Sequence, residues 1–248
     1  MPITIKSERE IELMTEAGRI LGIVHKELEK ALKPGMSTLD IDALGEEVIR
    51  SYGCEPSFLN YNGYPASICV SVNDEIVHGI PSAKHLIKEG DIVSLDAGVI
   101  YKGYHSDAAR THAVGEIRPD LQKLIDVTRE SFFEGIKFAK EGNHLYDISR
   151  AIGDYVESFG YGVVRELCGH GIGTSLHELP EIPNFQMRRR GPKLKAGMTL
   201  AIEPMVNLGT ERIRWMSDNW TVVTADRKES ILITKDEPKI LSIADGNV

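Results

Sequence analysis

The stretch from Lys33 to Gly53 reads KPGMSTLDIDALGEEVIRSYG, and a stretch of equal length from Lys140 to Gly160 reads KEGNHLYDISRAIGDYVESFG. Lys, Gly, Asp, Ile, Ser and the final Gly coincide between the two. Each stretch follows a helical run and precedes strand-like sequence, so we predict one domain, 1–248, whose pseudo-symmetric halves are about 1–117 and 118–248. The alternative is chance similarity, because glycine stops and apolar periodicity recur in any helical pair.

Two helices are expected before the first strands. Ser7 and Glu10 form a capping box. Apolar residues then recur at helical spacing, and the first helix is expected to end before Pro34. A second helix is expected to begin at Ser37 or Thr38, since both residue types are good N-caps.

Strands are expected after each helical pair. The ranges 67–72, 92–100 and 104–114 are rich in β-branched residues and alternate, and Gly103 is well placed to turn the second into the third. These elements predict an α+β protein whose two helix, helix, strand halves surround a central antiparallel sheet.

Composition excludes several classes of protein. Of the 248 residues, 42% are hydrophobic and 27% charged, as in an ordinary globular protein. A formal net charge of -8 argues against DNA as a partner, because neutralising phosphates needs surplus Lys and Arg. The three cysteines are too widely separated for a disulfide framework or a CxxC metal site. No apolar run approaches the ~18 residues of a membrane span, so we expect an untargeted, cytoplasmic protein.

Asp96 and Asp107 lie on either side of a predicted turn near Tyr101 and Lys102. A hairpin closed there sets the two carboxylates directly opposite each other, ~5 Å apart at Cβ. Carboxylates so close repel and raise each other's pKa unless a cation lies between them. The alternative of two ordinary turn or edge residues fits less well, because Asp is depleted in strand interiors. The pair therefore predicts a metal site.

His170 and Glu203 are further candidate ligands. His170 lies between glycines in CGHGIG, which allow close backbone approach, although such a His alone is more often a turn or core residue. Glu203 lies in a predicted strand over 200–204, LAIEP, that is otherwise apolar. It either has a buried partner such as a metal or points to solvent from an alternating strand. Carboxylates with one imidazole suit Mn, Fe, Co or Zn.

The predicted chemistry is hydrolysis. Two ions ~3.5 to 4 Å apart can share a water and lower its pKa toward ~7, which provides hydroxide at neutral pH. His78 in IVHGIP and His177 in LHE lie near strand ends or loops, where each can hydrogen-bond a scissile amide or donate a proton. For each, an ordinary surface or core histidine is the alternative.

The segments CVSVNDEIVHGIP, SLDAG, GYHSDAAR, CGHGIGTSLHE and LAIEPMV, in this order, resemble the type I methionine aminopeptidases over nearly the whole chain. The resemblance implies the pita-bread fold, a monomer, and removal of the initiator methionine from nascent polypeptides whose second residue is small. It also implies one or two divalent ions per chain, drawn from Co, Mn, Fe, Zn or Ni.

Residue roles follow from the same resemblance. It implies metal ligation by Asp96, Asp107, His170 and Glu203, with Glu203 also the general base, and catalytic, substrate-contacting roles for His78 and His177. It implies a methionine pocket lined by Tyr61, Tyr64, Cys69, Leu176 and Trp220. A core or surface role is the alternative for those five.

The chain departs from the family in one place. Family members carry a Phe-Glu-His-Thr stretch before the last strands, and its Glu bridges both metals. Here the segment after Trp220 is shorter by about six residues, and Glu229 stands one residue too close to the strand to match. A one-residue slip turns a side chain to the opposite face, so we expect one metal to be held weakly. The alternative is a backbone bulge that lets Glu229 substitute for the missing Glu.

The sequence leaves two other functions open. The missing Glu favours a module that binds peptide N-termini without cleaving them, whereas the three histidines and remaining carboxylates favour an enzyme. A prolidase-like peptidase is expected to have an additional N-terminal domain.

The run Arg188-Arg189-Arg190 suggests contact with ribosomal RNA near emerging chains, with a solvated loop as the alternative. No DNA or membrane partner is expected.

Overall fold

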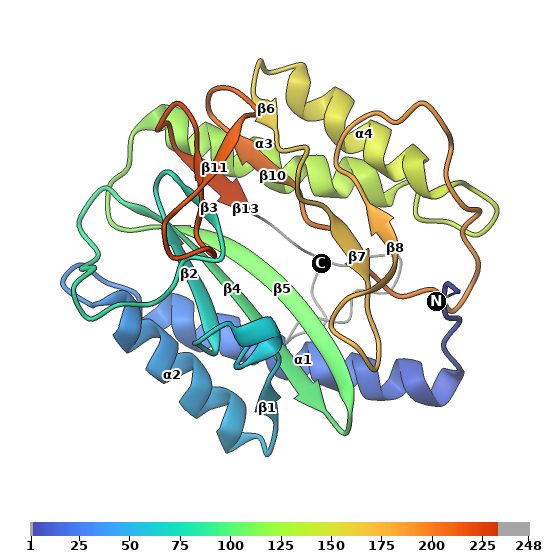
Figure 1. The fold of residues 1–248 in the computed structure, drawn as a ribbon, viewed down its shortest axis with the longest axis horizontal. Coiled ribbons are helices and arrows are strands. Elements are labelled where there is room, and N and C mark those ends of the chain that lie inside the picture. Colours follow the sequence, from blue (N-terminus) through green and yellow to red (C-terminus); the bar gives the residue numbers. More distant parts are fainter. Residues whose placement is uncertain (1, 233–248) are drawn as a thin grey trace.

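The computed structural model describes residues 2–232. Within this range the α-helices are α1 (Glu8–Ala31), α2 (Thr38–Ser51), α3 (Pro119–Ile136) and α4 (Leu145–Glu157). Figure 1 shows α1 and α2 on one side of the molecule, α3 and α4 on the other, and most strands between them. This arrangement confirms the α+β class. None of these helices is long and apolar enough to cross a membrane.

Side-chain caps fix the beginnings of the first two helices. The Ser7 hydroxyl accepts from the Glu10 backbone N–H, and the Glu10 carboxylate accepts from the Ser7 N–H at 2.7 Å, so the predicted capping box is present. Ser37 and Asp40 form the same arrangement before α2. Both predicted helix starts are therefore confirmed.

The strands are short apart from one hairpin. They are β1 (Glu55–Pro56), β2 (Ile68–Val72), β3 (Glu75–Val77), β4 (Ile92–Tyr101), β5 (Tyr104–Ala113), β6 (Gly162–Val163), β7 (Gly169–Gly171), β8 (Glu178–Ile182), β9 (Leu200–Ala201), β10 (Met205–Asn207), β11 (Ile213–Trp215), β12 (Val222–Thr224) and β13 (Ser230–Leu232), with a 3-10 turn, η1 (Tyr61–Gly63), before β2. Every pairing in the described range is antiparallel. In the largest sheet β4 pairs with β1, β2 and β5. The smaller sheets have the orders β13-β10-β6, β11-β12-β3 and β8-β7-β9.

The β4–β5 hairpin has a different register from the predicted one. Tyr101 pairs with Tyr104, so the loop consists of Lys102 and Gly103, both at positive φ, which suits a tight hairpin turn. Asp96 therefore lies opposite Ala109, and the predicted direct opposition of Asp96 and Asp107 is wrong. A two-residue shift preserves the face, so the two Asp side chains are diagonal neighbours on one side of the sheet.

Each helical pair packs on a core of its own. One large cluster joins Leu21 of α1 and Ile41 of α2 to Leu95 of β4. The other joins Phe132 of α3 and Ile148 of α4 to β10 and β13. Since α2 and α4 begin at positions that the sequence repeat pairs, the helices follow the repeat. The division into two halves stays a prediction.

Candidate metal centre

Three side chains from separate elements converge between the two cores. Asp107 lies on β5, His170 on β7, and Glu203 between β9 and β10, where the strand predicted over 200–204 is interrupted. One ligand atom from each lies within 4.8 Å of the others. The Nε2 atom of His170 is 3.1 Å from Oε1 of Glu203 and 3.4 Å from Oδ2 of Asp107. Its Nδ1 is 2.9 Å from the Gly171 carbonyl, to which it donates, so Nε2 faces the carboxylates.

Asp96 adds a third carboxylate beside this cluster. Burial raises the pKa of Asp96 well above its usual range, and the carboxylates of Asp107 and Glu203 raise it further. Burial likewise raises the pKa of Glu203, against the opposing charge of His170. Burial opposes protonation of His170, but Glu203 and Asp107 prevail and raise its pKa to about 11. The group thus needs positive charge at its centre.

The donor set fits a divalent cation. Oε1 of Glu203 is buried without an aligned hydrogen-bond donor in residues 2–232, although His170 is close to it. A buried carboxylate oxygen in that state lacks compensation that a cation would provide. One imidazole with two or three carboxylates matches the borderline metals Mn, Fe, Co and Zn.

Glycines allow His170 to approach its neighbours. A Cβ on Gly169 would lie 2.2 Å from the carbonyl oxygen of Ala201, and one on Gly171 would lie 2.2 Å from that of Leu179. Only a residue without a side chain fits between β8 and β9 at these points. The close backbone approach expected from the sequence is present.

Two further histidines face the same site. His78 follows β3 at φ 58 and presents its ring to Trp220 edge-on, with centroids 6.2 Å apart, and burial lowers its pKa. The ring of His177 lies 4.1 Å from that of His170. Burial, aided by the positive charge of His170, lowers the pKa of His177 to about 4. At neutral pH both histidines are uncharged and can donate one hydrogen bond.

One cavity of about 230 Å³ brings together every residue to which the sequence assigned a role. Its lining includes Tyr61, Tyr64, Cys69, His78, Asp96, Asp107, His170, Leu176, His177, Glu203 and Trp220. Phe58 and Asn62 also line it and were missed by the sequence reasoning. Asn62 has a positive φ, as is common for Asn in a turn. The Asn62-Gly63 pair was therefore a sequence signal for a turn at this place. The cavity therefore has acidic groups on one wall and aromatic groups on another.

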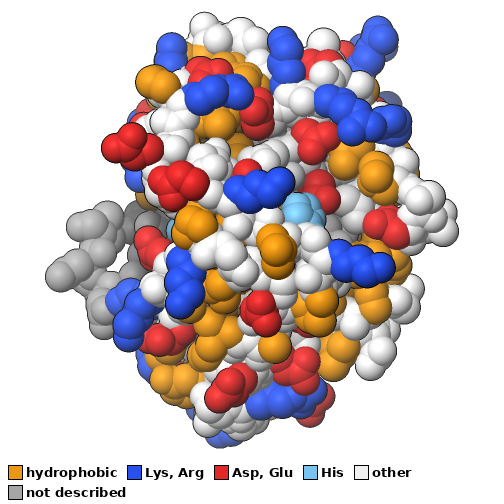
Figure 2. Space-filling model, turned by 90° about the vertical axis from the view of Figure 1, so that its left-hand side faces the viewer, with side chains coloured by type: hydrophobic (Ala, Val, Ile, Leu, Met, Phe, Trp, Pro, Cys, Tyr) orange, Lys and Arg blue, Asp and Glu red, His pale blue; other side chains and the backbone are white. Residues whose placement is uncertain are grey.

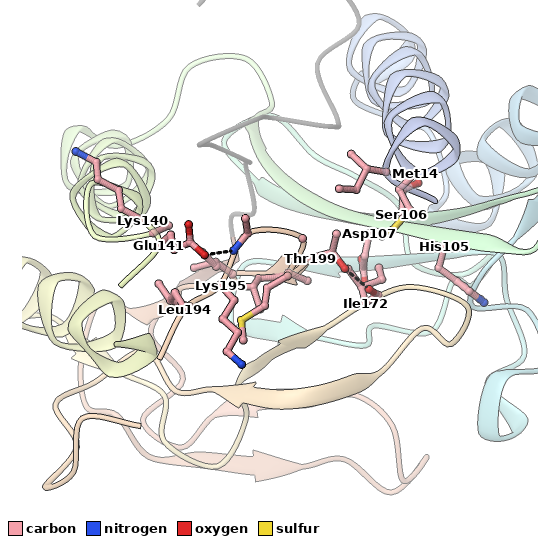
Figure 3. Close-up of a pocket in the computed structure, with 18 residues that line it drawn as sticks. Met14, His105, Ser106, Asp107, Lys140, Glu141, Ile172, Leu194, Lys195 and Thr199 are labelled. Carbon is pink, nitrogen blue, oxygen red and sulfur yellow. Dashed lines mark hydrogen bonds between the residues drawn. The ribbon is translucent and has the colours of Figure 1, made fainter. Parts of the chain in front are cut away.

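A larger cavity, of about 510 Å³, shares only Asp107 with the first (Figure 3). Its walls come from Met14 of α1 and the segment 194–202, with Lys140 and Glu141 at one end. In Figure 3 the Glu141 carboxylate accepts from the backbone N–H of Ala196. The larger cavity contains only one of the clustered ligands, Asp107, whereas the smaller cavity contains all three. The smaller cavity is therefore the candidate reaction site.

Glu229 does not join the cluster. Its carboxylate is bound by the Arg118 guanidinium at 2.9 Å, just before α3, and the partly exposed pair lies on the molecular surface. This placement agrees with the expectation that a one-residue slip turns Glu229 away from the metal site.

Surface charge is mixed on the face that Figure 2 shows, where basic and acidic side chains alternate and neither sign gathers in a broad field. Within the run Arg188-Arg189-Arg190, Arg190 is paired with Asp147 at 2.7 Å. That ion pair favours the solvated-loop alternative for this run over a phosphate contact.

Comparison with known proteins gives consistent matches over almost the full length. Residues 12–235 match the model of metallopeptidase family M24. The methionine aminopeptidase of Clostridium acetobutylicum is 52% identical, with 98% of this chain and 100% of that protein covered. Methionine aminopeptidase 1 of Bacillus subtilis is 51% identical over 92% of this chain and 91% of its own.

Solved structures agree in fold. The crystal structure of the Thermotoga maritima methionine aminopeptidase superposes with a TM-score of 0.95 at 41% identity and covers 98% of this chain and 100% of that one. The Pyrococcus furiosus prolidase, at 22% identity, superposes with a TM-score of 0.79 over 97% of this chain and 66% of its own, a likeness of fold alone. The pita-bread fold implied by the sequence resemblance is thereby confirmed.

Proposed function

The chain belongs to metallopeptidase family M24, among its type I methionine aminopeptidases, and from this premise we propose that it removes the initiator methionine from nascent proteins with a small second residue. The observation that carries the proposal is a single cavity in which Asp107, His170 and Glu203 meet an aromatic wall. The comparisons lend no support to the alternative of a non-cleaving binding module.

The residues divide the reaction between them. Asp107, His170 and Glu203 would hold a divalent ion, which would supply Lewis acidity and make water a nucleophile at neutral pH. Oε1 of Glu203, buried and lacking an aligned donor, accepts the proton of the attacking water. His78 and His177, both uncharged, donate hydrogen bonds to the scissile amide.

The aromatic wall selects the side chain. Tyr64 and Trp220 meet edge to face with ring centroids 5.1 Å apart, and Cys69 and Leu176 are buried beside them. An unbranched thioether fits such an apolar, irregular space and makes favourable contacts with aromatic rings. We therefore assign the methionine side chain to Tyr61, Tyr64, Cys69, Leu176 and Trp220.

The structure supports one tightly held ion per chain. The compact ligand group contains Asp107, His170 and Glu203 only, which leaves Asp96 as the single further carboxylate of the described cluster for a second ion. A second ion close by needs bridging ligands, and Glu229 is occupied by Arg118 on the surface.

The test of activity is release of methionine from Met-Gly-Met-Met by metal-free protein titrated anaerobically with Mn²⁺, Co²⁺ or Fe²⁺. Metal-dependent release that disappears in Asp107→Ala, which lacks one ligand of the compact group, is expected. No release from folded protein with any of the three metals would overturn the proposed activity.

The test of metal count is separate. After dialysis the protein is expected to retain one ion per chain by elemental analysis, and Mn²⁺-loaded protein to give the electron paramagnetic resonance spectrum of an isolated ion. Glu229→Ala, the matched control, should leave both unchanged, whereas Glu203→Gln should lose the ion. Two retained ions with a spin-coupled spectrum would overturn the single-ion proposal and leave the activity standing.

A further inference from the structure

The imidazole of His177 is held on one side by a phenol. The hydroxyl of Tyr61 lies 2.8 Å from Nδ1 of His177, and the two ring centroids are 5.2 Å apart. Because Nδ1 is engaged by Tyr61, Nε2 is the nitrogen of His177 left to meet a bound peptide. The ring also contacts His170, so it lies directly beside the metal ligands.

Tyr61 is presented by an unusually constrained turn. Asn60, Asn62 and Gly63 have φ values of 65, 50 and 88, all in the left-handed region. The Asn60 N–H donates to the Tyr64 carbonyl at 2.8 Å, and the Tyr64 hydroxyl donates to the Gly79 carbonyl at 2.9 Å. Left-handed residues persist only where surrounding contacts impose them. The phenol of Tyr61 is therefore placed by its backbone.

The backbone beneath His177 is anchored independently. The buried Lys6 ammonium pairs with the Glu178 carboxylate at 2.5 Å, and Glu178 also accepts from the Ser175 N–H at 3.3 Å. The His105 N–H donates to the Gly173 carbonyl at 2.8 Å. These contacts hold the backbone around His177 in place. The Tyr61 hydroxyl, in contrast, contacts Nδ1 of the ring and can therefore determine which ring nitrogen carries the proton.

We propose that Tyr61 is a positioning residue that sets the tautomer of His177. The Tyr61 hydroxyl donates to Nδ1, so the proton of the neutral ring resides on Nε2 and points into the cavity. A peptide carbonyl oxygen accepts hydrogen bonds and cannot donate them, so only this tautomer can hold it. The inference rests on the proposed function, which supplies the carbonyl, and it extends Tyr61 beyond a wall of the methionine pocket.

Tautomers are measured without reference to activity. In protein labelled with ¹⁵N-histidine and loaded with diamagnetic Zn²⁺, the two ring nitrogens of a neutral imidazole have distinct chemical shifts. His177 is assigned by the resonance lost in His177→Gln. We expect the Nε2–H form in the wild type and a mixture of both forms in Tyr61→Phe.

A matched variant separates this effect from disturbance of the pocket. Tyr64→Phe removes a phenol hydroxyl from the same cavity, but one that donates to the Gly79 carbonyl at 2.9 Å. It should leave the His177 tautomer unchanged. An Nδ1–H tautomer in the wild type, or identical His177 shifts in wild type and Tyr61→Phe, would overturn the proposal even in an active enzyme.

Kinetics provide the second readout. Tyr61→Phe keeps the ring and removes one neutral hydrogen bond, so kcat for Met-Gly-Met-Met should fall by about three- to tenfold. The loss should appear in kcat with KM little changed, because a hydrogen bond to the carbonyl strengthens as negative charge develops there. A rise in KM with kcat unchanged would assign Tyr61 to the pocket wall only.

Discussion

Glu203 occupies a break in the strand that the sequence predicts, and that break explains its double role. Because β9 ends at Ala201 and β10 begins at Met205, the intervening backbone turns the carboxylate toward His170. The Asn184 side chain donates to the Glu203 carbonyl at 2.6 Å and supports this turn. A carboxylate in a regular strand would alternate with its neighbours and could not be aimed so freely.

Replacing Glu203 with Gln removes a negative ligand and a proton acceptor while keeping the shape of the side chain. We expect methionine release to fall by roughly 10²- to 10⁴-fold, the range for loss of a general base. The measurement is the initial rate at saturating metal, with metal content determined on the same sample. A rate within threefold of the wild type, at equal metal content, would contradict the role of Glu203.

The elements around the site were only partly predictable. The capping residues Ser7 and Ser37 are local signals, and both helix starts were found. The predicted register of the β4–β5 hairpin is wrong because Lys102 lies in the turn at a positive φ, which its residue type does not favour. The convergence of His170 and Glu203 depends on long-range packing, which neither spacing nor composition encodes. It was reached through resemblance to a family.

At β7, the two glycines around His170 should tolerate no side chain. In Gly171→Ala the new methyl group would meet the Leu179 carbonyl, so β7 must move away from β8. We expect a loss of about 1 to 3 kcal/mol in the free energy of unfolding, together with weaker metal binding. Urea denaturation and calorimetric titration measure the two effects, and unchanged values in both would show that the contact yields.

At the start of α1, the capping box has a separate energetic role. Ser7→Ala removes the acceptor for the Glu10 N–H and should lower the free energy of unfolding by about 1 kcal/mol. Because the cap does not contact the candidate metal centre, methionine release at 25 °C should be unchanged. A fall in activity without a fall in stability would be the contrary result.

For the whole molecule, buried histidines predict sensitivity to acid. His25 on α1 is fully buried and donates from Nε2 to the Ala108 carbonyl at 2.8 Å. Burial, with the nearby Arg110 charge, lowers the pKa of His25 well below its ordinary value near 6.5. Below pH ~6.5, His25 therefore binds a proton in the unfolded chain but stays neutral in the folded chain. The stability contributed by neutral His25 is present above pH ~6.5 and is lost as the pH falls below it.

The comparison that isolates this effect uses His25→Leu. Below pH ~6.5 the wild type should lose up to about 1.4 kcal/mol per pH unit more than the variant, since one group accounts for the difference. Unfolding free energies at pH 5.5, 6.5 and 7.5 provide the measurement. Parallel pH profiles for the two proteins would mean that His25 is protonated in the folded state.

The candidate ligands come from both sides of the molecule. Asp107 belongs to the sheet that packs on α1 and α2, whereas His170 and Glu203 belong to the segments beside α3 and α4. An ion bound to all three closes a loop of chain between positions far apart in sequence, in the manner of a removable cross-link. Chelation would therefore loosen the docking of one helical pair against the other while each pair kept its own core. The availability of metal would therefore control how firmly the two helical pairs are held together as well as whether the reaction proceeds.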